Sequence, residues 1–176
     1  MNPDYFSKLK ERFSIEFKKH DRSGIYGYTQ RMLAYNSNKI EGSTLTEEQT
    51  ANLFDTGSLL ANHDIIRAKD IEEMTGHFSM FNEMLETIDA PLSQKLIKRY
   101  HYKLKVGVFE DLANGYPCGE FKNRKNRVGN LATTDPKDVP EKIQELFEWY
   151  EKQSEKSLYT LADLHIRYEH IHPFQD

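Results

Sequence analysis

Apolar residues recur every three to four positions along most of the chain, and this spacing predicts α-helices. The pattern covers about residues 3–20, 29–41, 46–57, 63–88, 92–104, 143–150 and 158–172. No internal repeat or low-complexity segment interrupts it. We therefore expect an all-α fold class, a mainly helical bundle around the last helix.

Local signals give several of the expected helix boundaries. Thr29 is expected to cap the second helix, and Gly42 to end it. Thr46 and Gln49 resemble a capping box, in which each side chain bonds the backbone N–H of the other residue. Gly57 would close the third helix, because glycine readily adopts the left-handed conformation found after a helix end.

One stretch, about residues 114–131, lacks the helical pattern and is dense in glycine and asparagine. Phe121 and Val128 flank the turn-rich residues 123–126 within it. This arrangement predicts a small β-hairpin or structured flap. We call residues 114–131 the flap.

Composition narrows the class of protein. The 176 residues have the length of one domain, so we expect a single domain over 1–176. The sequence has no apolar run of the roughly 20 residues that span a bilayer, and we expect no membrane partner. The net charge of −4 argues against a nucleic-acid partner. The single cysteine, Cys118, fits a reducing cytoplasm, where we expect the protein.

The last residues of the sequence combine a histidine, an aromatic ring and an acid. His172 precedes Pro173, which disfavours helix in the residue before it, so His172 is expected where a helix ends. There it could act as a general base, or it could be a structural histidine that bonds a loop carbonyl. Phe174 is expected to anchor the loop in the core. Asp176 could bind magnesium or serve as an ordinary turn residue.

A second grouping involves His165, Glu169 and His172, which are spaced four and three apart and share one helical face. Two histidines and a carboxylate could bind a transition metal. Alternatively, His165 and Glu169 form an ordinary pair on the helix surface. The metal interpretation corresponds to a metal-dependent hydrolase.

The flap carries a local cluster of positive charges: Lys122, Arg124, Lys125 and Arg127. It could be a solvated hairpin tip, or it could contact a phosphate or a partner protein. The edge of a hairpin can also hold an extended peptide through main-chain hydrogen bonds.

Residues 37–42 contain a charge that conflicts with its place in the second helix. Glu41 lies in the expected last turn, where the helix dipole disfavours a negative charge. Ser37 lies four residues earlier and shares its face. Such local conflicts are expected at functional sites, although an exposed glutamate can tolerate this small cost.

These motifs together resemble the Fic family. Residues 172–176 are similar to the start of its signature, H-P-F-x-(D/E)-G-N-G-R-x-x-R, which implies that they are the start of a catalytic loop. Residues 37–42 resemble its inhibitory motif, (S/T)-x-x-x-E-(G/N), on an inhibitory helix at about 29–42. Residues 119–128 resemble the flap that precedes the signature. The resemblance implies a single Fic-like domain over 1–176.

The resemblance also implies an activity: a protein adenylyltransferase that moves AMP from ATP to a Ser, Thr or Tyr hydroxyl of a target protein, which could be the chain itself. By this resemblance His172 is the catalytic base, Phe174 the loop anchor and Asp176 the ligand of Mg²⁺. The resemblance also implies that the inhibitory residues are Ser37, Glu41 and Gly42. It implies that the residues of the flap that dock the target are Phe121, Lys122 and Val128. ATP is the nucleotide substrate, and a homo-oligomer is left open.

The sequence departs from the family at one point. The glycine-rich segment and the two arginines that complete the signature do not follow Asp176, so phosphates would lack their backbone cradle. We expect this chain by itself to be inactive or nearly so. The alternatives are the metal-dependent hydrolase above and a helical interaction module without catalytic activity.

Overall fold

The computed structural model describes residues 3–60 and 65–175. The chain divides into two compact units. The first unit comprises Met1–Ile88 with Lys103–Phe109, and the second comprises Asp89–Tyr102 with Glu110–Asp176. Each unit has its own buried apolar cluster.

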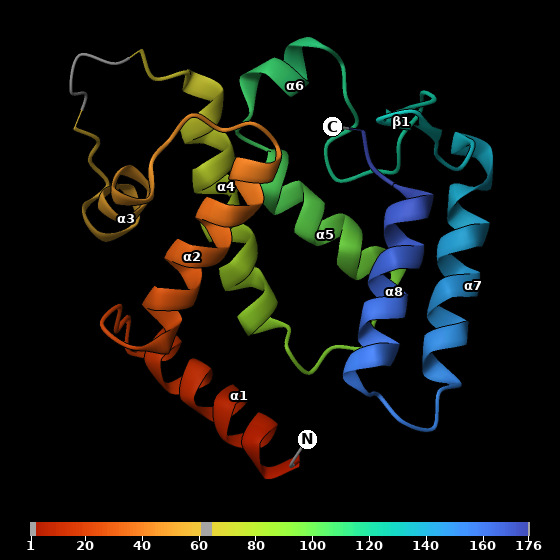
Figure 1. Ribbon diagram of the computed structural model, residues 1–176, viewed down its shortest axis with the longest axis horizontal. Helices are drawn as coiled ribbons and strands as arrows, with labels where there is room; N and C mark the ends of the chain where they lie inside the picture. Colours follow the sequence, from red (N-terminus) through yellow and green to blue (C-terminus); the bar gives the residue numbers. More distant parts are fainter. Residues whose placement is uncertain (1–2, 61–64, 176) are drawn as a thin grey trace. The chain divides into compact units, whose positions relative to one another are not determined.

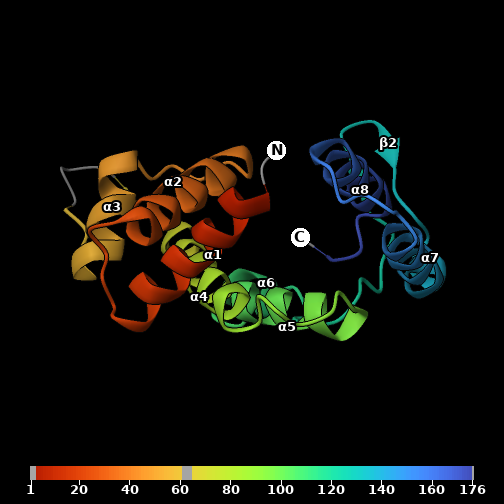
Figure 2. The same cartoon turned by 90° about the horizontal axis from the view of Figure 1, so that it is seen from below.

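Four helices make up most of the first unit: α1 (Pro3–Lys18), α2 (Ile25–Ile40), α3 (Glu47–Thr56) and α4 (Ala68–Glu86). Helix α2 packs against the other three, as Figures 1 and 2 show. Tyr26, Phe54 and Phe81 form one buried cluster between these helices. A second cluster joins Ala34 of α2 to Met74 of α4. The helical pattern predicted for this half of the chain is confirmed.

Helix α2 begins earlier than its sequence predicts. Its N-cap is Gly24, whereas the predicted cap, Thr29, lies inside the helix. Glu16 of α1 supplies the missing acceptor, because its carboxylate Oε2 accepts a hydrogen bond of 2.8 Å from the N–H of Tyr26. A carboxylate from another helix thus satisfies one of the free N–H groups at this helix end. The prediction of Thr29 as the cap was wrong because this acceptor is not local in sequence.

The boundaries of α3 are those that the sequence predicts. The hydroxyl of Thr46 accepts from the N–H of Gln49 at 3.1 Å, and the side chain of Gln49 accepts from the N–H of Thr46 at 2.9 Å. Gly57 ends the helix in the left-handed conformation with φ of 70°. Helix α4 is shorter than the predicted 63–88, and residues 63 and 64 lie outside the described part of the chain.

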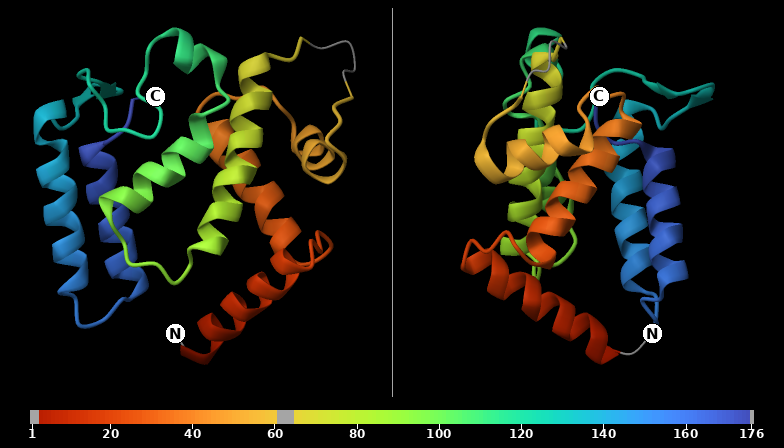
Figure 3. Two further views of the ribbon diagram at one scale, coloured as in Figure 1. Left: turned by 180° about the vertical axis from the view of Figure 1, so that it is seen from behind. Right: turned by 60° about the vertical axis from the view of Figure 1, so that its left-hand side comes forward.

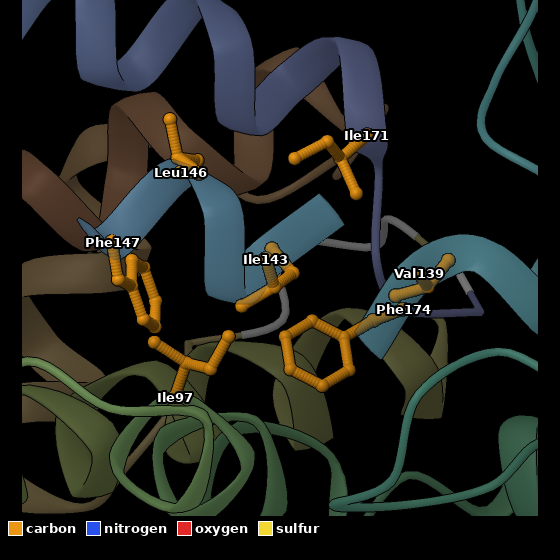
Figure 4. Packing of buried hydrophobic residues seen from close by; sticks show 7 residues of the cluster. All are labelled: Ile97, Val139, Ile143, Leu146, Phe147, Ile171 and Phe174. Carbon is orange, nitrogen blue, oxygen red and sulfur yellow. The ribbon is translucent and has the colours of Figure 1, made fainter. Parts of the chain in front are cut away.

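Two further helices link the units in sequence: α5 (Gln94–Lys105) and α6 (Phe109–Ala113), of which α6 was not predicted. In the second unit, the 3₁₀ turn η1 (Pro136–Asp138) leads into α7 (Val139–Glu151), and α8 (Leu158–Ile171) follows. Helices α7 and α8 lie side by side (Figures 1 and 3). The core between them and α5 consists of the seven residues in Figure 4: Ile97, Val139, Ile143, Leu146, Phe147, Ile171 and Phe174.

The flap ends in a short antiparallel hairpin of β1 (Arg127–Val128) and β2 (Leu131–Ala132). Val128 pairs with Leu131, and Arg127 with Ala132. The hairpin loop therefore lies at residues 129–130, not at the predicted 123–126. Gly129 explains this position, since its φ of 57° is one that a tight hairpin loop needs and that glycine adopts without strain.

Helices dominate the described residues, and the hairpin is the only sheet among them. This confirms the predicted fold class. In the part of the chain that the structure describes, none of the helices has the length and apolar character needed to cross a membrane.

A buried imidazole makes the stability of the first unit depend on pH. Burial of His77 in α4 lowers its pKa from 6.5 to about 4. The unfolded chain therefore binds a proton between these two values that the folded chain does not bind, so stability falls as pH drops through this window. We expect His77 alone to reduce the free energy of unfolding by about 3 kcal/mol from pH 7 to pH 4.

Denaturant unfolding of wild type and His77→Gln at both pH values measures this contribution. The variant lacks the titrating group, so its stability should fall by the smaller amount that the carboxylates cause. Equal losses in the two proteins would contradict the assignment.

Candidate catalytic loop at the end of helix α8

Helix α8 has a defined start and a defined end. The hydroxyl of Ser157 accepts from the N–H of Thr160 at 3.2 Å and caps the first turn. At the other end, His172 adopts the left-handed conformation with φ of 45° and ψ of 72°. Its N–H donates to the carbonyl of Tyr168 at 2.9 Å, which closes the last turn. His172 therefore lies where the helix ends, as its place before Pro173 predicts.

The conformation of His172 is unusual for a residue with a side chain. Among the described non-glycine residues, His20 and His172 alone have positive φ. Left-handed backbone costs a non-glycine residue on the order of 1 kcal/mol, and such strain persists only where neighbouring contacts enforce it. Here the residues on either side of His172 are held by contacts with α5 and the flap.

Phe174 supplies the apolar contact. Its side chain is 8% exposed and belongs to the core cluster with Ile143 and Ile171 (Figure 4). The ring stacks on the imidazole of His101, with centroids 4.0 Å apart and planes 3° apart. Phe121 of the flap lies at a tilt on the same ring, at 5.7 Å. The ring of Phe174 thus holds the chain after His172 against both α5 and the flap.

Lys122 supplies the polar contact, and its position contradicts the predicted role in target docking. The residue is only 2% exposed, and its ammonium points into the protein. Nζ donates to Oδ1 of Asn126 at 2.7 Å, to Oγ1 of Thr133 at 2.7 Å and to the carbonyl of Ile171 at 3.2 Å. A side chain so occupied does not present its charge to a target protein.

Two further hydrogen bonds join the flap to the loop. The N–H of Lys122 donates to the carbonyl of Pro173 at 2.9 Å, and Nδ2 of Asn126 donates to the carbonyl of Phe174 at 3.1 Å. The hydroxyl of Thr133 contacts Asn126 and completes the group. The carbonyls of residues 171, 173 and 174 are all bound by one short part of the flap.

Glu169 lies between the two histidines of the predicted metal site. Its two carboxylate oxygens are each 4.0 Å from an imidazole nitrogen, one from Nδ1 of His165 and one from Nδ1 of His172. No group of three His, Cys, Asp or Glu side chains within the described residues could hold a metal ion. The proposed metal triad is therefore not assembled here, and Glu169 is instead a carboxylate beside His172.

The remaining flap residues divide between core and surface. Phe121 packs against the core, and the ammonium of Lys98 lies 4.4 Å from its ring. Val128 and its strand partner Leu131 are exposed. The basic cluster separates, because Lys122 points inward while Lys125 pairs with Asp135 at 3.0 Å. Asp176, the predicted magnesium ligand, lies outside the described residues.

The predicted inhibitory residues lie in the first unit. Glu41 is the C-cap of α2, and its N–H bonds the carbonyl of Ser37 at 3.3 Å. Gly42 follows with φ of 85°, which turns the chain away from the helix. The carboxylate of Glu41 is exposed, and it has no hydrogen bond or ion pair with any described residue. Ser37 is half-buried on the same face.

Three residues that hold the loop were missed from the sequence: His101, Asn126 and Thr133. His101 had a usable signal, because it lies four residues after Ile97 on the buried face of α5. Its Nδ1 accepts from the N–H of Gly119 at 2.9 Å, so it also fixes the start of the flap turn. Asn126 and Thr133 had no such signal, since polar residues in a turn-rich segment are usually solvated.

This chain is similar to known proteins in sequence and in fold. Residues 91–176 match the model of the Fic/DOC family. The protein adenylyltransferase Fic of Drosophila willistoni is 27% identical over 156 residues, which cover 81% of this chain and 28% of that protein. A Fic domain containing signaling protein from Bacteroides thetaiotaomicron VPI-5482 has a similar structure, with a TM-score of 0.71 at 26% identity, over 96% of this chain and 66% of that one.

A Fic-1 segment from C. elegans is also similar in fold, with a TM-score of 0.67 at 16% identity, over 98% of this chain and 54% of that one. The matched part of this chain spans 28% of the length of the Drosophila willistoni protein. The family match contains the flap, α7, α8 and the 172–175 loop. Through residues 91–176, the chain belongs to the Fic/DOC family.

Proposed function

We propose that the full-length protein transfers AMP from ATP to a Ser, Thr or Tyr hydroxyl of a target protein, with His172 as the base. The observation that carries this proposal is the geometry of His172. Its backbone lies in the left-handed conformation at the end of α8, and its side chain is 25% exposed. The carbonyls of Ile171 and Pro173, on either side of it, are held by hydrogen bonds from Lys122. The adenylyltransferase activity of the Drosophila relative supports the same reaction.

In this reaction the imidazole takes the proton from the target hydroxyl as the hydroxyl oxygen attacks the α-phosphorus of ATP. The bond from that phosphorus to the bridging oxygen of the β-phosphate breaks, and pyrophosphate leaves with the bonding electrons. The products are the AMP–protein ester, pyrophosphate and protonated His172, which then releases its proton to water. General base catalysis of this kind typically contributes about 10²–10⁴-fold to the rate.

One nearby carboxylate can stabilise the imidazolium that forms in this reaction. The carboxylate of Glu169 lies 4.0 Å from Nδ1 of His172 and attracts a positive charge on the ring. The negative pole at the C-terminal end of α8 is already paired with a cation, because the ammonium of Lys122 binds the carbonyl of Ile171 there. Glu169 is therefore the group that we expect to stabilise the ring after it takes the proton.

The groups that would bind Mg²⁺ and the phosphates of ATP are proposed from the family resemblance alone. By the family resemblance, Asp176 would hold the metal, and the glycine-rich part of the signature would follow it. Magnesium, when bound, would neutralise charge on the phosphates of ATP. The exposed pair Val128 and Leu131 would hold the target segment along the hairpin, which Phe121 anchors to the core. We place the protein in the cytoplasm, consistent with its single cysteine.

Glu41 is proposed as an inhibitor of this activity. Its exposed carboxylate follows α2 without a partner among the described residues, so it is available to pair with a cation of the active site. Ser37 bonds its N–H and Gly42 turns the chain, and together they hold the carboxylate at the helix end. The family resemblance identifies the cation as the second arginine of the signature.

The first test of the proposal concerns the base. Full-length protein is incubated with labelled ATP and Mg²⁺, and label on protein is counted. We expect His172→Ala to reduce transfer by about 10²–10⁴-fold because the hydroxyl proton then has no acceptor. His170→Ala is the matched control, since His170 is exposed on the same helix, and it should keep wild-type transfer. Full activity of His172→Ala would show that the base is assigned wrongly.

The second test concerns inhibition. We expect Glu41→Gly to raise label transfer roughly tenfold, a typical size for coupling between two sites. Glu41→Gln should raise it as well, because the effect comes from the lost charge. Glu48→Gln is the control, as Glu48 is an exposed carboxylate in the first turn of α3. If transfer by both Glu41 variants stays at the wild-type level, Glu41 is not inhibitory.

A further inference from the structure

We propose that Lys122 is a positioning residue for His172, acting with Asn126 and Thr133 through the backbone of the 172–175 loop. The inference rests on the proposed function, in which His172 is the base. Lys122 does not touch the reacting atoms in this account. It fixes the conformation from which the imidazole reaches them.

The ammonium of Lys122 has three N–H donors, and they meet three acceptors: Oδ1 of Asn126, Oγ1 of Thr133 and the carbonyl of Ile171. The residue is 2% exposed, so these bonds replace water. A buried ammonium that lost one of these acceptors would be costly, which makes the geometry of the group well defined.

The hydrogen bond from Lys122 to Ile171 lies at the end of α8, because Ile171 is the last residue of that helix. Its carbonyl is among the last four of α8, which have no partner within the helix. A cation at this end also complements the negative pole of the helix dipole. Lys122 therefore caps α8 from the flap, although it lies 49 residues before Ile171 in the chain.

Lys122 also binds the chain after His172, through its backbone N–H. The N–H of Lys122 donates to the carbonyl of Pro173 at 2.9 Å. Because the carbonyls before and after His172 are both held by Lys122, a change in φ or ψ of His172 would displace at least one of them. Asn126 binds the next carbonyl, that of Phe174, and extends the restraint. This explains how a non-glycine residue stays at a φ of 45°.

A lysine at position 122 thus links the flap to the base. A misplacement of about 1 Å at a reacting group can lower a rate on the order of 10²-fold. Loss of the Lys122 ammonium should therefore reduce the rate of the chemical step while leaving ATP binding nearly intact. A residue that only stabilised the fold would instead lower the amount of folded enzyme and not its kcat.

The experiment compares Lys122→Met with Lys142→Met in the full-length protein. Methionine keeps the length and apolar stem of lysine and removes the ammonium. Lys142 is a half-exposed lysine that pairs with Glu145 on the surface of α7, so it is a matched control. We expect Lys122→Met to lower kcat by about 10- to 100-fold with KM for ATP within about twofold, and Lys142→Met to change neither.

Lys122→Arg tests the chemistry of the contact. Arginine keeps a positive charge and N–H donors, so this variant should recover part of the kcat lost in Lys122→Met. Hydrogen exchange of the amides of Lys122 and His172, which donate to the carbonyls of Pro173 and Tyr168, gives a readout that does not depend on activity. These amides should exchange faster in Lys122→Met than in wild type and Lys142→Met.

Several results would overturn the inference. One is a folded Lys122→Met protein with the kcat of Lys142→Met, and another is a rise in KM alone, which would indicate substrate contact. If Lys122→Met does not fold, Thr133→Val replaces it, because it removes one acceptor and keeps the side-chain shape. If wild type transfers no AMP, the proposed function fails, and unchanged exchange in the variants would still refute the positioning role.

Discussion

The backbone at the end of α8 depends on the hydrogen bonds that Lys122 makes to both sides of His172. Its ammonium binds the carbonyl of Ile171, and its N–H binds the carbonyl of Pro173. Through these two bonds a flap residue sets the backbone of the helix end. Since His172 lies between the two bound carbonyls, they fix the direction in which its side chain leaves the backbone. The strained conformation of His172 is therefore a consequence of contacts made far away in sequence.

An apolar contact completes this polar one. Phe174 enters the core of α5, α7 and α8 and stacks on His101, while Asn126 binds the Phe174 carbonyl. Removing either kind of contact would leave the loop held at one side only. The flap thus has two roles in this account. Its inner side, with Lys122 and Asn126, fixes the loop, whereas its exposed hairpin, with Val128, is left for a target segment.

Local signals in the sequence predicted the helices, the capping box of Thr46 and the stop at Gly57, because those residues bond their own neighbours. The start of α2 was mispredicted because its acceptor, Glu16, comes from another helix. The same limit applies to the site. His172 was found from the proline that follows it, but Lys122 was read as a surface charge. Its acceptors come from three separate segments, and lysine is almost never buried unless it is paired.

If Lys122 holds His172 in its left-handed conformation, removing the ammonium should release the loop. Crystal structures of the full-length wild-type protein and of its Lys122→Met variant, determined in one crystal form, show whether it does. We expect a positive φ at His172 in wild type, with Lys122 bound to the carbonyls of Ile171 and Pro173. In the variant we expect His172 to leave this region and its imidazole to be displaced. An unchanged loop and imidazole in the variant would show that Lys122 does not hold His172.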